Sequence, residues 1–329
     1  MSSGQRSPRS ERDAIRSGDR RAIAQVITLL ESARPDQAER GRAILEQLVP
    51  YTGDAIRVGI TGPPGVGKST FIEALGLSLV ERGQRVAVLA VDPSSPLSGG
   101  SILGDKIRME RLAQHPDAFI RPSPSGGSLG GVAHRSREVM MLCEAAGYEV
   151  VLVETVGIGQ SEVAVAAMVD FFLVLLMPGG GDELQGLKKG VIELADALVV
   201  NKADGDQRAA AERTCAEYKA ALGLIRSTSP AWRPPALLAS ARSGEGIEAV
   251  WEVVQRHRAE LEASGELQRR RREQARAWMW SLVEEGLGER FQAHPGVAAE
   301  IPRLEAEVES LKSTPLAAAE ALLSIFSKR

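Results

Sequence analysis

The sequence has few aromatic residues and few cysteines, and neither sign of charge dominates. Aromatic residues make up 4% of the 329 residues, and the formal net charge is −3, so no overall basic field favours nucleic acid or an anionic membrane. The two cysteines, Cys143 and Cys215, cannot supply a zinc quartet, and they suit a reducing compartment better than a disulfide framework. The most apolar stretch, Val163–Met177, contains Asp170 and is too short to cross a bilayer. We therefore expect a soluble, cytoplasmic protein with no nucleic-acid or membrane partner.

From Ala55 onward, short apolar runs alternate with helical patterns. Runs this apolar are typical of parallel strands buried on both faces, and strands separated by helices form a doubly wound sheet. The expected strands are Ile56–Ile60, Arg85–Val91, Ala118–Arg121, Glu149–Val153, Phe171–Met177, Ala197–Val200 and Ala236–Ala239. The sequence thus predicts an α/β fold with a mainly parallel sheet that binds its ligands at the carboxyl ends of the strands.

Both ends of the chain favour helices. Residues 1 to about 10 are rich in Ser, Arg and Pro and are expected to be disordered, and two amphipathic helices should precede Pro50. After about Gly246 the pattern predicts only helices: Ile247–Leu261, Leu267–Leu287, Val297–Leu311 and Pro315–Phe326. We expect an N-terminal helical extension over residues 1–53, a nucleotide-binding domain over 54–262 and a C-terminal helical dimerisation arm over 263–329. The basic run Arg269–Arg272 is interpreted as a solvated face or an inter-subunit salt-bridge patch.

Residues 62–69, GPPGVGKS, fit the Walker A pattern between a predicted strand and a predicted helix. The glycines let backbone N–H groups surround phosphates, and the helix N-terminus adds a favourable dipole. Lys68 should reach the β- and γ-phosphates, and the Ser69 hydroxyl should ligate Mg²⁺. The predicted phosphate-binding residues are Gly62, Pro63, Pro64, Gly65, Val66, Gly67, Lys68, Ser69, Thr70 and Gly157.

Acidic residues at strand ends are candidate magnesium ligands, because Mg²⁺ prefers oxygen donors. Asp92 and Glu154 each end an apolar strand, as a Walker B acid does, although either could be a helix cap or a surface charge. Residues 154–157 are similar to the Asp-x-x-Gly motif of GTPases with Glu in place of Asp, which would bring the Gly157 N–H to the γ-phosphate. Asp105 is a weaker candidate and could equally be an N-cap. The predicted catalytic residues are Lys68, Asp92, Asp105 and Glu154, and the predicted metal ligands are Ser69, Asp92, Asp105 and Glu154.

A second motif, Asn201-Lys202-Ala203-Asp204, follows a predicted strand. The Asp204 carboxylate can accept hydrogen bonds from N1–H and N2–H₂ of guanine, whereas adenine offers neither donor. Lys202 can lie along the base, Asn201 can brace the pocket, and a backbone N–H at Ser240–Ala241 should lie near the guanine O6. We therefore expect GTP and GDP as ligands.

Five segments, GPPGVGKST, VDPSSP, VETVGIGQSE, PGGGDELQGLKKG and NKAD, together resemble the MeaB/ArgK family of P-loop GTPases over roughly residues 40 to 260. The resemblance implies a P-loop NTPase G domain in a homodimeric GTPase chaperone of methylmalonyl-CoA mutase. Such a chaperone gates delivery of adenosylcobalamin to the mutase and protects it. The resemblance also places Asp92 and Asp105 in a first switch and Glu154 in a second. Residues 177–188 match a third switch that reports nucleotide state through Asp182, Gln185 and Lys188, although this segment could simply cap the next helix at Asp182.

The second switch bears on the rate of hydrolysis. Ras-type GTPases place a water-orienting Gln directly after the switch glycine, but here Ile158 holds that position and Gln160 follows later. We therefore expect slow intrinsic hydrolysis that a partner accelerates. Two alternatives stay open: a metal-insertion GTPase, which would need clustered His or Cys ligands, and a metabolic kinase, which would not need the motif at 201–204.

Overall fold

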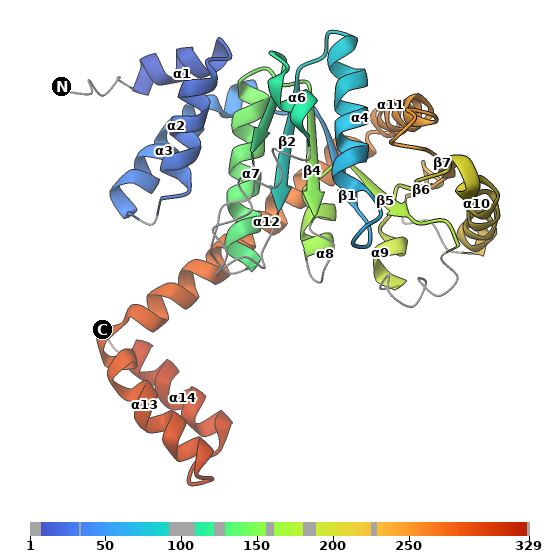
Figure 1. The fold of residues 1–329 in the computed structure, drawn as a ribbon. Helices are drawn as coiled ribbons and strands as arrows, with labels where there is room; N and C mark the ends of the chain where they lie inside the picture. Colours follow the sequence, from blue (N-terminus) through green and yellow to red (C-terminus); the bar gives the residue numbers. More distant parts are fainter. Residues whose placement is uncertain are drawn as a thin grey trace. The chain divides into compact units, whose positions relative to one another are not determined.

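The computed structural model describes residues 8–32, 34–91, 109–121, 129–155, 161–179, 189–224 and 229–327. In this part of the chain, seven parallel strands form one sheet in the order β3-β2-β4-β1-β5-β6-β7 (Figure 1). The strands are β1 (Ile56–Thr61), β2 (Val86–Val91), β3 (Ala118–Arg121), β4 (Val150–Thr155), β5 (Phe171–Leu176), β6 (Ala197–Val200) and β7 (Ala236–Leu238). The predicted α/β fold with a parallel, doubly wound sheet is confirmed.

Helices cover both faces of the sheet. The main helices are α4 (Lys68–Glu81), α6 (Glu110–Gln114), α7 (Leu129–Ala145), α8 (Ser161–Ala166), α9 (Lys189–Glu193), α10 (Arg208–Leu224) and α11 (Ile247–Ala263). Alternate residues of each strand enter one of two apolar cores, as expected for strands buried on both sides. One core contains side chains of α4, α6 and α11, and the other contains side chains of α7, α8 and α10. The sheet is therefore packed between helices on both of its faces.

The N-terminal extension is part of the second core. Its helices are α1 (Pro8–Arg16), α2 (Arg20–Leu30) and α3 (Pro35–Leu48), which end in a short 3-10 turn over Val49–Tyr51. Ile15 of α1 is fully buried, and Arg40 of α3 forms an ion pair with Glu11 at 2.6 Å. The expected disorder to about residue 10 is therefore wrong for residues 8–10, and three helices rather than two precede Pro50. A short helix with one strong buried anchor is hard to recognise in a Ser- and Arg-rich segment.

The C-terminal helices are α12 (Glu266–Ala293), α13 (Pro295–Glu309) and α14 (Pro315–Ser327). The chain divides into two compact units, residues 1–272 and 273–329. In the second unit α13 packs on α14, and the rings of Phe291 and Phe326 meet edge to face with centroids 5.4 Å apart. The N-terminal helices belong to the first unit together with the sheet, so the division into three domains stays a prediction.

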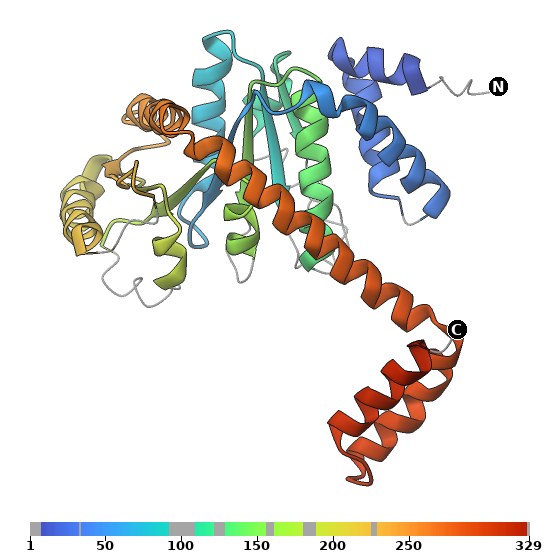
Figure 2. The same ribbon diagram turned by 180° about the vertical axis from the view of Figure 1, so that it is seen from behind.

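The arginine run at the start of α12 is not simply a solvated face. Arg271 forms two hydrogen bonds with the carboxylate of Asp170, at 2.8 and 2.6 Å, and also donates to the carbonyl of Ala55 at 2.8 Å. Arg270 pairs with Asp196 at 3.3 Å. Both acids are almost fully buried at the starts of β5 and β6, and Figure 2 shows the start of α12 beside the sheet. For these two arginines the interpretation as a solvated or inter-subunit patch is wrong, because their partners lie in the same chain.

Within the described residues, no helix is both long enough and apolar enough to cross a membrane.

Candidate nucleotide site

The P-loop turns from β1 into α4 through three glycines in the left-handed region. Gly62, Gly65 and Gly67 have φ angles of 152°, 79° and 94°. A side chain at Gly62 would place Cβ 2.6 Å from the carbonyl oxygen of Leu175, so only glycine fits there. Gly67 is the N-cap of α4 and has no side chain to cover the first backbone N–H groups. The loop therefore presents these donors at a helix N-terminus, the arrangement that binds phosphate.

Lys68 folds back over the same loop. Its Nζ donates to the carbonyl oxygen of Gly62 at 2.8 Å and lies 3.4 Å from that of Pro63. The side chain is anchored in the first turn of α4 and is partly buried. The cation therefore lies at the mouth of the P-loop, where phosphate oxygens can replace the carbonyls as its partners.

Ser69 and Glu154 lie side by side. The Ser69 hydroxyl donates to a carboxylate oxygen of Glu154 at 3.0 Å, and Glu154 is 7% exposed. Glu154 is held in β4 between Ile60 of β1 and Ala90 of β2. A hydroxyl and a buried carboxylate are hard oxygen donors of the kind that Mg²⁺ prefers, so the residues present fit the ion.

The motif at 201–204 lies at the carboxyl end of β6. Lys202 has φ 59°, a left-handed conformation that costs a non-glycine residue about 1–2 kcal/mol. Backbone bonds hold this turn, because Asn201 N–H donates to Leu176 and Ala203 N–H donates to Ala239. The Asp204 carboxylate accepts a hydrogen bond from the Ser240 hydroxyl at 2.7 Å. The fully buried Ser240 thereby fixes the half-buried acid that is predicted to bind guanine.

Two side chains join the base motif to the P-loop. The buried Asn201 amide donates to the carbonyl of Val66 at 2.8 Å and accepts from the Ala241 N–H at 3.1 Å. The Lys202 ammonium donates to the carbonyl of Gly65 at 2.6 Å. The two motifs therefore form one continuous site at the carboxyl edge of β1, β5 and β6. The expected closeness of the Ser240–Ala241 backbone to the guanine O6 stays a prediction.

Several predicted residues lie outside the described part of the chain. They are Asp92, Asp105, Gly157, Asp182, Gln185 and Lys188. The structure thus brings together the P-loop, Glu154 and the base motif, and the remaining candidate ligands and switch residues stay predictions.

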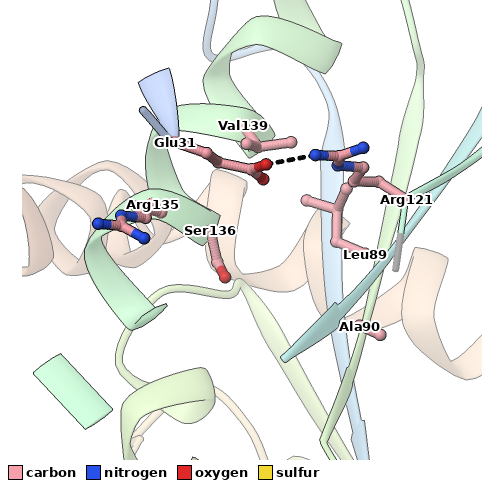
Figure 3. A pocket seen from close by; sticks show the side chains of 7 residues that line it. All are labelled: Glu31, Leu89, Ala90, Arg121, Arg135, Ser136 and Val139. Atoms are coloured by element: carbon pink, nitrogen blue, oxygen red, sulfur yellow. Dashed lines mark hydrogen bonds and ion pairs between the residues drawn. The ribbon is translucent and has the colours of Figure 1, made fainter. Parts of the chain in front are cut away.

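Figure 3 shows a pocket on the face of the sheet that α7 covers, where α2, β2, β3 and α7 meet. It is lined by Glu31, Leu89, Ala90, Arg121, Arg135, Ser136 and Val139. Glu31 at the end of α2 forms an ion pair with Arg121 at the end of β3. None of the predicted site residues lines this pocket, and its ion pair holds the N-terminal extension against the sheet.

Sequence reasoning did not single out three threonines near the site. Thr155 donates a hydrogen bond to Thr61 at 2.7 Å, and both hydroxyls are buried. Thr214 in α10 accepts a hydrogen bond from the Gly179 N–H at 3.0 Å. No sequence signal sets the first pair apart, because β1 also contains Arg57 and β4 also contains Glu154, so a polar residue at the end of either strand is not distinctive.

Comparison with known proteins agrees with this geometry. Residues 23–296 match the family described as "Methylmalonyl Co-A mutase-associated GTPase MeaB". The chain belongs to the MeaB family. It is a P-loop GTPase that hydrolyses GTP.

Other MeaB-like proteins match over most of their length. "Putative GTPase" of Caulobacter vibrioides is 56% identical over 309 residues, 94% of each chain. "GTPase ArgK" of Escherichia coli is 49% identical over 271 residues, 82% of each chain. "Methylmalonic aciduria type A homolog, mitochondrial" of Mus musculus is 47% identical over 322 residues, 95% of this chain and 78% of that protein. The solved structure titled "LAO/AO transport system kinase" shares 37% identity and a TM-score of 0.79 over 98% of both chains.

Proposed function

We propose that this GTPase is a chaperone of methylmalonyl-CoA mutase that gates delivery of adenosylcobalamin to the mutase and protects it. The membership in a family named for its association with that mutase supports the partner. The likeness to a methylmalonic aciduria type A homolog points the same way. Cobalamin gating rests on the resemblance of the motifs to this family.

The observation that carries the nucleotide chemistry is the junction of the two motifs at Asn201. In our proposal Lys68 and the P-loop N–H groups hold the phosphates, and Asp204, fixed by Ser240, reads guanine. Because Asn201 joins the P-loop to the base motif, both ends of a guanine nucleotide bind to one rigid body.

Ser69 and Glu154 would hold Mg²⁺ beside the phosphates, together with Asp92 and Asp105. When bound, the ion neutralises charge on the β- and γ-phosphate oxygens. The protein's own contribution is to keep the partly buried Ser69 hydroxyl 3.0 Å from the buried Glu154 carboxylate. Lys68 supplies a further positive charge at the P-loop. With Ile158 after the switch glycine, we propose slow intrinsic turnover that the mutase accelerates.

The test of the base site replaces Asp204 with Asn. The new amide presents a donor to the N2–H₂ group of guanine, so GTP and GDP affinity should fall by about 100-fold, as expected for a site that loses one charged hydrogen-bond pair. Asp206→Asn is the matched control, because Asp206 is an exposed acid in the adjoining turn Gly205–Gln207. Equal GDP affinity in the two variants, measured by titration calorimetry, would contradict the assignment.

The test of the partner is GTP turnover with and without methylmalonyl-CoA mutase. We expect phosphate release to increase when the mutase is added, and a cobalamin-loading assay should then depend on GTP hydrolysis. GTP turnover that is already fast alone, or that the mutase leaves unchanged, would contradict the chaperone proposal. Transfer of phosphate to a metabolite instead of water would favour the kinase alternative.

We also propose that the protein is a cytoplasmic homodimer whose contacts lie in the C-terminal arm. In α12, Trp280, Val283 and Leu287 recur at helical spacing on one face and are 53%, 41% and 52% exposed. Leu316 and Leu323 are likewise exposed on α14. Exposed apolar stripes of this kind are typical of helix partners.

Charge variants of α12 test the dimer. Leu287→Glu should convert the dimer into a monomer in light scattering, whereas Glu289→Lys on the opposite face should leave it unchanged. A truncation from Leu267 would be a poor test, because it also removes Arg270 and Arg271, which pair with the sheet domain. Dimers of unchanged stability in Leu287→Glu would contradict the proposal.

A further inference from the structure

Thr61 and Thr155 are buried hydroxyl residues in the last row of the sheet. They are 1% and 0% exposed, and the Thr155 hydroxyl donates to the Thr61 hydroxyl at 2.7 Å. Their other neighbours in this row are apolar, since Thr155 pairs with Val91 and Thr61 pairs with Val174. Valine has nearly the shape of threonine, so packing alone does not require two hydroxyls here.

The hydroxyl bond begins where the backbone pairing ends. β1 and β4 pair in register through Ile60 and Glu154, and Thr61 and Thr155 are the next residue of each strand. Thr61 directly precedes the P-loop glycine Gly62, and Thr155 directly follows Glu154. The bond therefore joins two strand ends at the points where the chain leaves the sheet to form the nucleotide site.

The two threonines and Glu154 face opposite sides of the sheet. Val151 and Val153 lie in the core beneath α7 and α8, which places Thr155 on the same face by alternation. Ile60 lies in the core beneath α4, and Glu154 reaches Ser69 of α4 on that face. The hydroxyls thus do not touch the proposed ligands, and any effect on the ligands passes through the backbone of residues 154 and 155.

We propose that Thr61 and Thr155 are positioning residues that hold the Glu154 carboxylate against the Ser69 hydroxyl and so set the affinity for Mg²⁺. The inference rests on the proposed magnesium site. Without this bond the end of β4 keeps its backbone pairing with β2, where Thr155 pairs with Val91, but loses its side-chain link to β1, and Glu154 would then spend part of its time away from Ser69. Nucleotide binding without magnesium needs only the P-loop and the base motif, so it should not depend on the threonines.

The test compares wild type with Thr155→Val, Thr61→Val and the conservative Thr155→Ser. A fluorescent GDP analogue is titrated over a series of Mg²⁺ concentrations and also in EDTA. In EDTA all variants should bind the analogue like wild type. The Mg²⁺ concentration that gives half of the affinity gain should rise about fivefold in either valine variant, the size expected for one ordinary hydrogen bond. Thr155→Ser keeps the hydroxyl and should restore the wild-type value.

The double variant adds a second criterion. Because each valine removes the same bond, Thr61→Val with Thr155→Val should shift the Mg²⁺ midpoint no further than either change alone. Valine variants that melt at lower temperature but keep the wild-type Mg²⁺ midpoint would show a structural role only and overturn the inference. A wild-type protein whose GDP affinity ignores Mg²⁺ would overturn the magnesium proposal and this inference with it.

Discussion

The side-chain amide of Asn201 donates a hydrogen bond to the backbone carbonyl of Val66, a residue 135 positions earlier in the chain. The same side chain accepts from the Ala241 N–H in the loop after β7. One buried amide therefore joins three segments that are distant in sequence, and both its donor and its acceptor group are used. This residue therefore holds the phosphate loop and the base motif in register.

Replacing Asn201 with Ala should weaken nucleotide binding without unfolding the protein. The change leaves the Val66 carbonyl and the Ala241 N–H without this partner, and each buried polar group costs about 1–3 kcal/mol when its bond is lost. We expect GDP affinity to fall by about 10- to 100-fold. Titration calorimetry measures the affinity and circular dichroism checks the fold. Asn201→Asp keeps the acceptor but places a buried carboxylate against the Val66 carbonyl oxygen, so it should lose at least as much GDP affinity as Asn201→Ala. An Asn201→Ala variant with wild-type affinity would contradict the bridging role.

The arginine run of α12 provides a prediction whose control is the next residue in the chain. Arg271→Met should destabilise the protein by about 3–5 kcal/mol, because it leaves the buried Asp170 carboxylate without its bidentate partner. Arg272 is exposed, so Arg272→Met should change stability by less than about 0.5 kcal/mol. Urea unfolding followed by far-ultraviolet circular dichroism compares the two. Equal losses in both variants would show that the run acts only as a charged surface.

Asp196 should make stability depend on pH on the acid side. Burial raises the pKa of Asp196, but the imidazole of His257, whose Nε2 lies 3.5 Å from the carboxylate, and the charge of Arg270 outweigh it, so the pKa lies below the usual value. Because the pKa is lower in the folded protein, the ionised carboxylate stabilises the fold above the unfolded-state pKa of about 3.9. That stabilisation is lost as the pH falls through the folded-state value. The melting temperature of wild type should therefore fall more steeply below about pH 4. In Asp196→Asn the melting temperature should fall less steeply over the same pH range.

Thr214 is predicted to matter for the response to the partner rather than for hydrolysis itself. Its hydroxyl accepts from the Gly179 N–H at the root of the proposed third switch, and α10 follows directly after the base motif. Thr214→Val should reduce mutase-stimulated GTP turnover several-fold while intrinsic turnover stays within about twofold, since the bond is outside the phosphate site. Thr214→Ser keeps the acceptor and is the matched control. Loss of intrinsic and stimulated turnover in equal proportion would contradict the prediction.

The sheet could be predicted from the sequence because its strands have a distinctive, nearly continuous apolar composition. Buried parallel strands need apolar side chains on both faces, and all seven predicted runs overlap strands in the structure. The four C-terminal helices were predicted from the helical spacing of their apolar residues, and their boundaries differ from the structure by a few residues. The P-loop and the motif at 201–204 have fixed spacings set by phosphate and guanine, so their place at the strand ends followed from the motif alone.

Contacts between distant segments could not be predicted in this way. A run of four arginines has the same appearance whether its partners are water or the buried acids Asp170 and Asp196, and only the tertiary fold decides. The helix α1 was missed because a nine-residue helix has a weak pattern and depends on packing of Ile15 in the core. The Thr61–Thr155 bond was missed because a single threonine at a strand end is an ordinary residue until its neighbour is known.

The two ion pairs between α12 and the sheet have a mechanical consequence. Arg271 holds Asp170, the residue before β5, and Arg270 holds Asp196, the residue before β6. The far ends of these two strands lead to Met177, where the proposed third switch begins, and to Asn201 of the base motif. A strand in the middle of a sheet hardly stretches, so it behaves as a rod. The first turns of α12 therefore hold the starts of the two strands whose far ends lead to the proposed third switch and to the proposed guanine motif, so a partner bound to α12 would act on both through one sheet.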